Sequence, residues 1–307
     1  MLNVLAITSP VFLLIGLGFA AVHAGLIEKT GMRPLGAFVI SFALPALIFK
    51  ALAQRPIAEI ASPGYLLAYG GGSLIAYGLL FAFARRAGKP LTAAAIHALG
   101  GGISNSAFIG YPLVTLALGP VAAVAMALNM IVENLIMMPL ALGLAESGGN
   151  GGGSRAGIVA GTALRLAKNP LIISICAGTA FSLLGVPLSG PFGKTLDLLA
   201  AASAPVALFT IGGTLAGLPV RGMLGDAGQI AFTKLIVHPA AVFAMLQLVP
   251  TPAPDLYKAC VIFAGMPMAA IYPLLAQPYG RAEQSAAALA LATVASFFTI
   301  SVLLLIV

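Results

Sequence analysis

Long apolar runs make up most of this chain, and short groups of charged residues, glycines and prolines separate them. A helix that spans the hydrocarbon core of a bilayer needs about 20 mostly apolar residues. The pattern therefore predicts an all-α integral membrane protein with ten transmembrane helices and almost no chain left for a soluble domain. The predicted helices cover roughly residues 4–25, 34–53, 64–84, 91–118, 120–144, 169–186, 193–217, 228–249, 257–279 and 283–306.

Composition excludes several classes of protein. Of the 307 residues, 60% are hydrophobic and 7% are charged, whereas soluble domains carry about 25% charged residues. The net charge of +7 comes from basic residues scattered singly or in pairs, so we expect no nucleic acid as a partner. Cys176 and Cys260 lie inside apolar runs and are expected to serve packing. No HExxH or GxSxG hydrolase motif occurs, and we expect no enzyme activity, cofactor or metal.

Charge in the short loops sets the predicted orientation, because cytoplasmic loops carry an excess of Lys and Arg. Ten such residues follow odd-numbered helices and four follow even-numbered ones, with Lys234 set aside because it lies inside a span. We therefore expect a multi-pass protein of the inner (plasma) membrane with both termini outside. A Gly-rich cytoplasmic linker with a short helix, residues 147–168, separates a first five-helix half, residues 1–146, from a second, residues 169–307.

The two halves share an internal repeat. Residues 42–49, FALPALIF, align with residues 202–209, ASAPVALF, at an offset of 160. Residues 108–119 align with residues 269–280 at an offset of 161, so that a Tyr-Pro pair falls in register in both. Because five is odd, the second half must enter the membrane with the opposite polarity. Inverted repeats of this kind are typical of secondary transporters that bind their substrate near the midplane.

The fourth and ninth predicted helices carry residues that interrupt a helix. Residues 100–112 read GGGISNSAFIGYP, and the ninth helix contains Pro267 and Pro273. Proline lacks an N–H group and clashes with the carbonyl four residues earlier. We expect each helix to restart at a proline, so that two helix N-termini converge on a site suited to a carboxylate. The alternative is that Gly and Pro serve only packing or kinks, since both are frequent in membrane helices.

Side chains beside these interruptions are the candidate substrate-binding residues. The amide of Asn105 can both donate and accept hydrogen bonds. The other polar candidates are hydroxyl groups. The full set is Asn105, Ser104, Ser106, Tyr111, Pro112, Pro267, Tyr272 and Pro273.

Three segments carry a resemblance to a known family. They are ISNSAFIGYPL at residues 103–113, Met266 and Pro267 followed by LLAQPYG at residues 274–280, and TKLIVHP at residues 233–239. Together they resemble the auxin efflux carrier family, which includes plant auxin carriers and bacterial transporters of malonate and similar acids. The resemblance implies ten helices in two inverted repeats, a mobile transport part, and a scaffold part that often forms a homodimer. It also implies that Asn105, Pro112 and Pro267 occupy crossover positions, although this chain has apolar residues such as Ile271 where relatives often carry a second Asn.

Ionisable residues inside a membrane helix are costly and indicate function by default. Glu133 could carry a coupling proton or pair with a cation, or it could make a polar contact in the scaffold or a dimer interface. Lys234 and His238 are one turn apart on one helix face, and Lys234 could neutralise an anionic substrate or Glu133, or only snorkel. His97 is expected to be an interior histidine, and Asp197 is expected to be solvated.

These patterns favour a secondary transporter for a small organic anion, an auxin-like or malonate-like mono- or dicarboxylate, that works by alternating access in the lipid bilayer. The alternative is a sodium-coupled symporter of the bile-acid type with the same fold.

Overall fold

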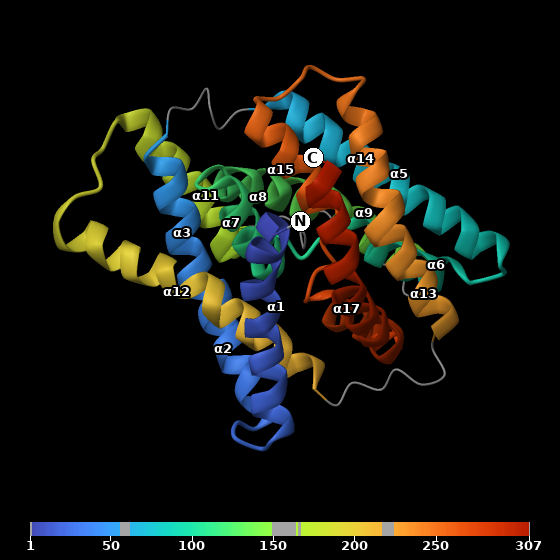
Figure 1. The fold of residues 1–307 in the computed structure, drawn as a ribbon. Helices are drawn as coiled ribbons and strands as arrows, with labels where there is room; N and C mark the ends of the chain where they lie inside the picture. Colours follow the sequence, from blue (N-terminus) through green and yellow to red (C-terminus); the bar gives the residue numbers. More distant parts are fainter. Residues whose placement is uncertain (1, 56–61, 149–163, 165–166, 217–223, 307) are drawn as a thin grey trace.

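The computed structural model describes residues 2–55, 62–148, 164, 167–216 and 224–306, and the described part is all-α with no β-strand. Most of the predicted linker with its short helix, residues 149–163 and 165–166, lies outside the described residues. Figure 1 shows the arrangement of the helices. Their bounds are α1 Leu2–His23, η1 Lys29–Gly31, α2 Met32–Phe38, η2 Val39–Ala43, α3 Leu44–Ala53, α5 Pro63–Arg86, α6 Leu91–Gly102, η3 Ser106–Gly110, α7 Tyr111–Leu118, α8 Val121–Val132, η4 Glu133–Met137, α9 Met138–Ser147, α11 Pro170–Leu184, α12 Gly190–Leu215, α13 Leu224–Phe232, η5 Thr233–Val237, α14 His238–Leu246, α15 Pro254–Ala264, α16 Tyr272–Ala276, η6 Gln277–Tyr279 and α17 Ala282–Ile306.

Seven helical segments of the described chain are long and apolar enough to cross a membrane. They coincide with seven of the ten predicted spans, and α11 is a shorter apolar helix within an eighth. The other two predicted spans, 91–118 and 257–279, are each divided by a non-helical stretch, so that no single helix in them reaches the length of a span. The spanning segments are Ala6–His23, Lys29–Ala53, Pro63–Arg86, Val121–Ser147, Gly190–Leu215, Gly225–Leu246 and Ala282–Ile306.

The helices pack as two bundles. In the first bundle α1 packs on α12 and α3 packs on α11 and α12. The second bundle contains α5 to α9 and α13 to α17, in which α5 packs on α6 and α14, and α13 packs on α17. Contacts of α8 with α3 and of α1 with α7 and α17 join the two. Each bundle therefore combines helices from both predicted halves of the chain.

Two glycines let α1 and α12 approach to backbone contact. A Cβ atom at Gly18 would lie 2.0 Å from the carbonyl oxygen of Phe209, and one at Gly212 would lie 1.8 Å from that of Ile15. Only glycine fits at such distances, and small residues at helix contacts are the usual means of close packing in membranes. The first bundle is thus built around a backbone-to-backbone contact between α1 and α12 that leaves no room for a side chain at Gly18 or Gly212.

Four π-helical segments, η2, η3, η4 and η5, share one relation to proline. Each ends two residues before a proline, so that the third residue of the segment is the one four positions before that proline. A regular α-turn would place the carbonyl group of that residue against the proline ring, and the wider turn relieves the clash. The helices therefore continue across these prolines, which are Pro45, Pro112, Pro139 and Pro239.

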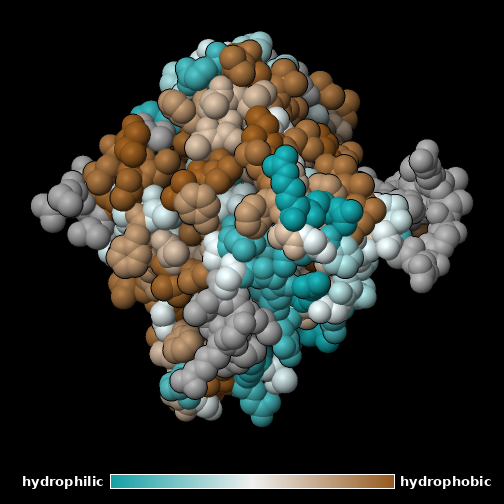
Figure 2. Space-filling model, turned by 90° about the vertical axis from the view of Figure 1, so that its right-hand side faces the viewer, coloured by the Kyte–Doolittle hydropathy of each residue, from teal (hydrophilic) through white to brown (hydrophobic). Residues whose placement is uncertain are grey.

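The outer surface is rich in hydrophobic side chains. On the face in Figure 2 hydrophobic residues cover most of the upper part, and hydrophilic residues gather across the lower centre. Large apolar side chains such as Leu79 and Phe83 on α5 are exposed. Exposed apolar surface of this kind marks contact with a membrane or a partner.

Candidate functional site

The two interrupted segments meet at their interruptions. Helix α6 ends at Gly102, residues 103–105 are not helical, and the chain becomes helical again at Ser106 and continues to Leu118. Helix α15 ends at Ala264, and α16 begins only at Tyr272. The backbone N–H of Asn105 donates a hydrogen bond of 2.7 Å to the carbonyl oxygen of Pro267. The structure thus brings two predicted site residues from opposite halves of the chain into direct contact.

Asn105 caps the restarted helix with one end of its side chain. Its Oδ1 accepts a hydrogen bond of 3.2 Å from the N–H of Phe108, the usual bond of an N-cap residue. The side chain is 2% exposed, and its Nδ2 has no hydrogen-bond partner among the described residues. A buried donor without an acceptor costs about 1–3 kcal/mol. An acceptor group such as a carboxylate would remove this cost.

After the first interruption the helix begins at a different residue from the one predicted. The helix begins at Ser106 and not at Pro112, because the π-turn η3 carries the helix across the proline ring. The N–H groups of Ser106 and Ala107 are consequently the helix N-terminal donors that lack an intrahelical acceptor. Pro112 is buried in the first turn of α7, beside the partly buried Tyr111.

The second restart follows the prediction in position, with Pro273 in the first turn of α16. However, α16 is only five residues long, so it does not supply a second full helix N-terminus. The buried hydroxyl of Tyr272 donates to the carbonyl oxygen of Ile96 at 3.1 Å and holds α16 against α6. The expected pair of convergent N-termini is therefore reduced to one, and the second interruption contributes backbone carbonyls.

Glu133 lies against the first interruption. Its Oε1 accepts hydrogen bonds from the N–H of Ser104 at 3.0 Å, the hydroxyl of Ser106 at 3.1 Å and the hydroxyl of Tyr69 at 2.8 Å. The side chain is 1% exposed and lies inside the second bundle. Its carboxyl group is therefore not exposed on a surface where a second copy of the protein could contact it. Its carboxyl group stands where a negative charge is favoured by the helix N-terminus.

Helix α5 supplies a polar face whose residues were not among the predicted site residues. The hydroxyl of Tyr69 also lies 2.9 Å from Oγ of Ser104, and Tyr65 donates to Oδ1 of Asn129 at 2.9 Å. Nδ2 of Asn129 in turn donates to Oγ of Ser106 at 3.3 Å. Tyr65, Tyr69 and Ser73 recur every four residues, which places them on one helix face. That spacing was the available signal for them.

Lys234 binds the end of α15. Its Nζ donates to the carbonyl oxygen of Ala264 at 2.5 Å and lies 2.8 Å from Nδ1 of His238. Nε2 of His238 lies 2.9 Å from Oγ of Ser73. Because an ammonium group only donates, Nδ1 must accept here, and a neutral His238 then carries its proton on Nε2.

The burial of this group decides between the predicted roles of Lys234. The side chain is fully buried and its Nζ is held by buried partners, so the snorkelling alternative is wrong. No direct ion pair joins Lys234 to Glu133 in the described part of the chain. The two instead lie in neighbouring networks that meet where the rings of Tyr69 and His238 pack at 5.5 Å.

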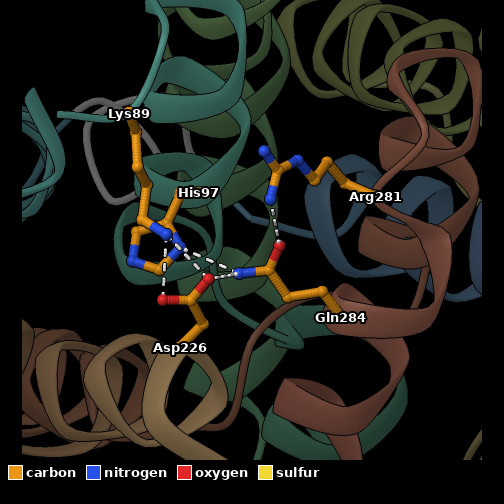
Figure 3. A network of polar contacts seen from close by, with 5 residues as sticks. All are labelled: Lys89, His97, Asp226, Arg281 and Gln284. Atoms are coloured by element: carbon orange, nitrogen blue, oxygen red, sulfur yellow. Dashed lines mark hydrogen bonds and ion pairs between the residues drawn. The ribbon is translucent and has the colours of Figure 1, made fainter. Parts of the chain in front are cut away.

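A second polar cluster joins the ends of α6, α13 and α17 near the loop before α6 (Figure 3). Nζ of Lys89 lies 2.9 and 2.7 Å from the two carboxylate oxygens of Asp226. Gln284 donates to Asp226 at 2.5 Å, accepts from Arg281 at 3.0 Å, and lies 3.3 Å from Nδ1 of His97. His97 is buried, in accordance with an interior histidine. This cluster fixes three helix ends of the second bundle to one another.

Asp197, which was expected to be solvated, lies on α12 of the first bundle. Asp197 is half exposed, and its carboxylate forms an ion pair with Lys50 of α3.

Two interrupted helices in contact inside an apolar bundle, with buried ionisable groups beside them, define a membrane transport protein. Comparison with known proteins agrees. The profile of the family described as "Membrane transport protein" matches residues 4–153 and 155–305, and the chain belongs to this family of the auxin efflux type, as its motifs indicated.

Two relatives are similar to this protein over most of its length. It is 32% identical over 310 residues to a protein of Rhizobium meliloti (strain 1021) named "Putative malonate transporter", covering 99% of this chain and 96% of the relative. It is 25% identical over 276 residues to a protein of Methanothermobacter thermautotrophicus named "Uncharacterized transporter", covering 87% of this chain and 85% of the relative.

Proposed function

We propose that the protein is a secondary transporter for a small organic anion, with the substrate bound where the two interruptions meet. The observation that carries the proposal is the buried Nδ2 of Asn105, which has no acceptor among the described residues. Together with the N-terminal N–H groups of Ser106 and Ala107 it forms a set of donors that suits a carboxylate. The name of the Rhizobium meliloti relative adds malonate as the first substrate to test, ahead of other mono- and dicarboxylates.

The charges around this meeting point are compatible with an anion. Glu133 alone would repel a carboxylate, but it accepts three hydrogen bonds and Lys234 stands in the adjoining network. The ammonium of Lys234 and the helix N-terminus offset the charge of Glu133, so a further negative group meets no uncompensated carboxylate.

The architecture we propose is ten spans in two inverted five-helix repeats. Its support is the position of the two interruptions in the chain, 103–105 and 265–271, near the offset of the sequence repeat, and their contact through Asn105 and Pro267. In the proposed cycle the second bundle, which contains both interruptions, moves against the first and exposes the site to each side in turn. The apolar contacts of α8 with α3 and of α1 with α7 and α17 are the surfaces that would slide.

The sodium-coupled alternative is less well supported by the geometry. Sodium prefers several oxygen ligands, and the carbonyl oxygen of Ala264, which ends α15 at the second interruption, is already bound by the ammonium of Lys234. The ammonium group of Lys234 therefore occupies the position from which a sodium ion would bind this carbonyl oxygen. We propose that transport does not require sodium.

Uptake of labelled malonate into proteoliposomes tests the proposal. We expect uptake that saturates, that unlabelled malonate inhibits, and that is unchanged when sodium is replaced by potassium. A parallel thermal-shift screen of mono- and dicarboxylates identifies the preferred acid, since a ligand at a hundred times its Kd stabilises the folded state by about 2.7 kcal/mol. Absence of both uptake and stabilisation with all acids would refute the anion site, and strict sodium dependence would favour the symporter.

A further inference from the structure

A deep apolar groove lies on the outside of the second bundle, between α14, α15 and α17. Its volume is about 850 Å³, within the range of roughly 300–1,000 Å³ that is usual for ligand pockets. Phe243 and Phe298 on its walls are 48% and 67% exposed, so that the groove is open on the side facing away from the bundle. The residues that line it include Leu235, Phe243, Lys258, Gly265 and Phe298.

The groove has a polar end and an apolar end. Its polar end lies where α14 finishes and α15 begins, and includes Thr251 and Lys258. Lys258 is exposed and is the one charged side chain among the described residues that line the groove. From Lys258 to Gly265 the groove follows α15 for seven residues, about 10 Å at 1.5 Å per residue, which is most of one leaflet's hydrocarbon.

We propose that this groove binds one acyl chain of an anionic phospholipid, with Lys258 contacting the phosphate. Apart from Tyr257, Lys258 and Thr299, the side chains on the walls along α14, α15 and α17 are apolar, so a hydrocarbon chain matches most of the groove in polarity. The single cation at the polar end selects a negative headgroup by charge complementarity. Asp255, one turn earlier on α15, is exposed and does not line the groove.

The bound acyl chain of the phospholipid would lie next to the candidate transport site. Leu235 and Gly265 on the groove wall directly follow Lys234 and Ala264, which are joined by the hydrogen bond that ends α15. A Cβ atom at Gly265 would lie 2.6 Å from the side chain of Leu303, so the wall is closely packed at that depth. Lipid binding is inferred from the groove alone and does not depend on the identity of the transported acid.

The chain contains no tryptophan, and a single introduced one reports lipid contact cleanly. Phe243→Trp places the indole on the groove wall. Leu67→Trp is the matched control, because Leu67 is 54% exposed and does not line the groove. Leu67 also lies at the same end of the bundle, on the first turns of α5, where Gly64 is in contact with the backbone of Pro250. Both variants are reconstituted in phosphatidylcholine nanodiscs with a minor fraction of phosphatidylglycerol brominated on its acyl chains, which quenches tryptophan on contact.

We expect stronger quenching at position 243 than at position 67, and an apparent affinity for brominated phosphatidylglycerol about fivefold above that for brominated phosphatidylcholine. This is the preference given by about 1 kcal/mol per basic residue near an anionic surface. Lys258→Gln should abolish the preference while quenching at position 67 stays unchanged. Equal quenching at the two positions, or a preference that survives Lys258→Gln, would overturn the proposal. Quenching at position 67 with none at 243 would do the same and would indicate a second copy of the chain over the groove. If Phe243→Trp does not fold, Phe298→Trp provides the same test.

Discussion

Two substitutions of Asn105, to alanine and to serine, test the roles of its side-chain oxygen and nitrogen separately. Alanine removes Oδ1, which caps Phe108, and Nδ2, the donor we assign to the substrate. Serine is also a good N-cap residue and keeps the first function without the second. A hydrogen bond to a charged group contributes about 1.5–3 kcal/mol, so both variants should weaken binding of the preferred acid roughly ten- to a hundredfold. Only alanine should also lose about 1 kcal/mol of stability, through the lost cap.

Calorimetric titration and thermal unfolding on the same preparations measure these effects. The serine variant is the critical one, because its fold is expected to match the wild type while its affinity falls. Wild-type affinity in Asn105→Ser would refute the assignment of Nδ2 to the substrate. Equal loss of stability in both variants, with affinity retained, would instead show that Asn105 only supports the interruption.

Four further outcomes are expected. Glu133→Gln should flatten the pH dependence of uptake while binding persists, because an amide cannot titrate; an unchanged profile in proteoliposomes would remove Glu133 from coupling. Lys234→Met should lower the unfolding temperature, because the carbonyl of Ala264 and Nδ1 of His238 each lose a buried partner at about 1–3 kcal/mol; an unchanged unfolding temperature would contradict this. Gly212→Ala should destabilise the protein by about 1–3 kcal/mol through overpacking against Ile15, whereas Gly16→Ala, with open space around it, should not; equal melting of the two would count against the close contact. A cysteine at Gly151, with both native cysteines replaced, should react with an impermeant reagent only after the membrane is opened; labelling of intact cells would reverse the topology.

The sequence predicted the spanning segments and both interruptions, because length, apolar content, Gly and Pro act locally along the chain. It placed Asn105 and Pro267 at the meeting point through the repeat and the family motif. It misplaced the first restart, since a proline was expected to start a helix, whereas η3 accommodates Pro112 within one. Whether a helix breaks or widens at proline depends on the packing of neighbouring helices, which one sequence does not reveal.

The contacts of the ionisable residues could not be predicted from the sequence for the same reason. Tyr69 meets Glu133 across 64 positions and Lys234 meets Ala264 across 30, and no local pattern fixes such pairs. The four-residue spacing of Tyr65, Tyr69 and Ser73 marked a polar face on α5, but its partners depended on the arrangement of the bundle.

The wide turns before proline also set how this chain tolerates changes in length. A π-turn closes with one residue more than an α-turn, so the residues on either side of it keep nearly the faces that they would have around an α-turn. Deleting one residue of η5, such as Ile236, would therefore convert the wide turn into an α-turn and leave His238 close to the face on which it meets Ser73. The same deletion would bring the ring of Pro239 against a carbonyl group one turn earlier in the helix. At these four places a single-codon deletion removes the room made for a proline and does not rotate the helix face.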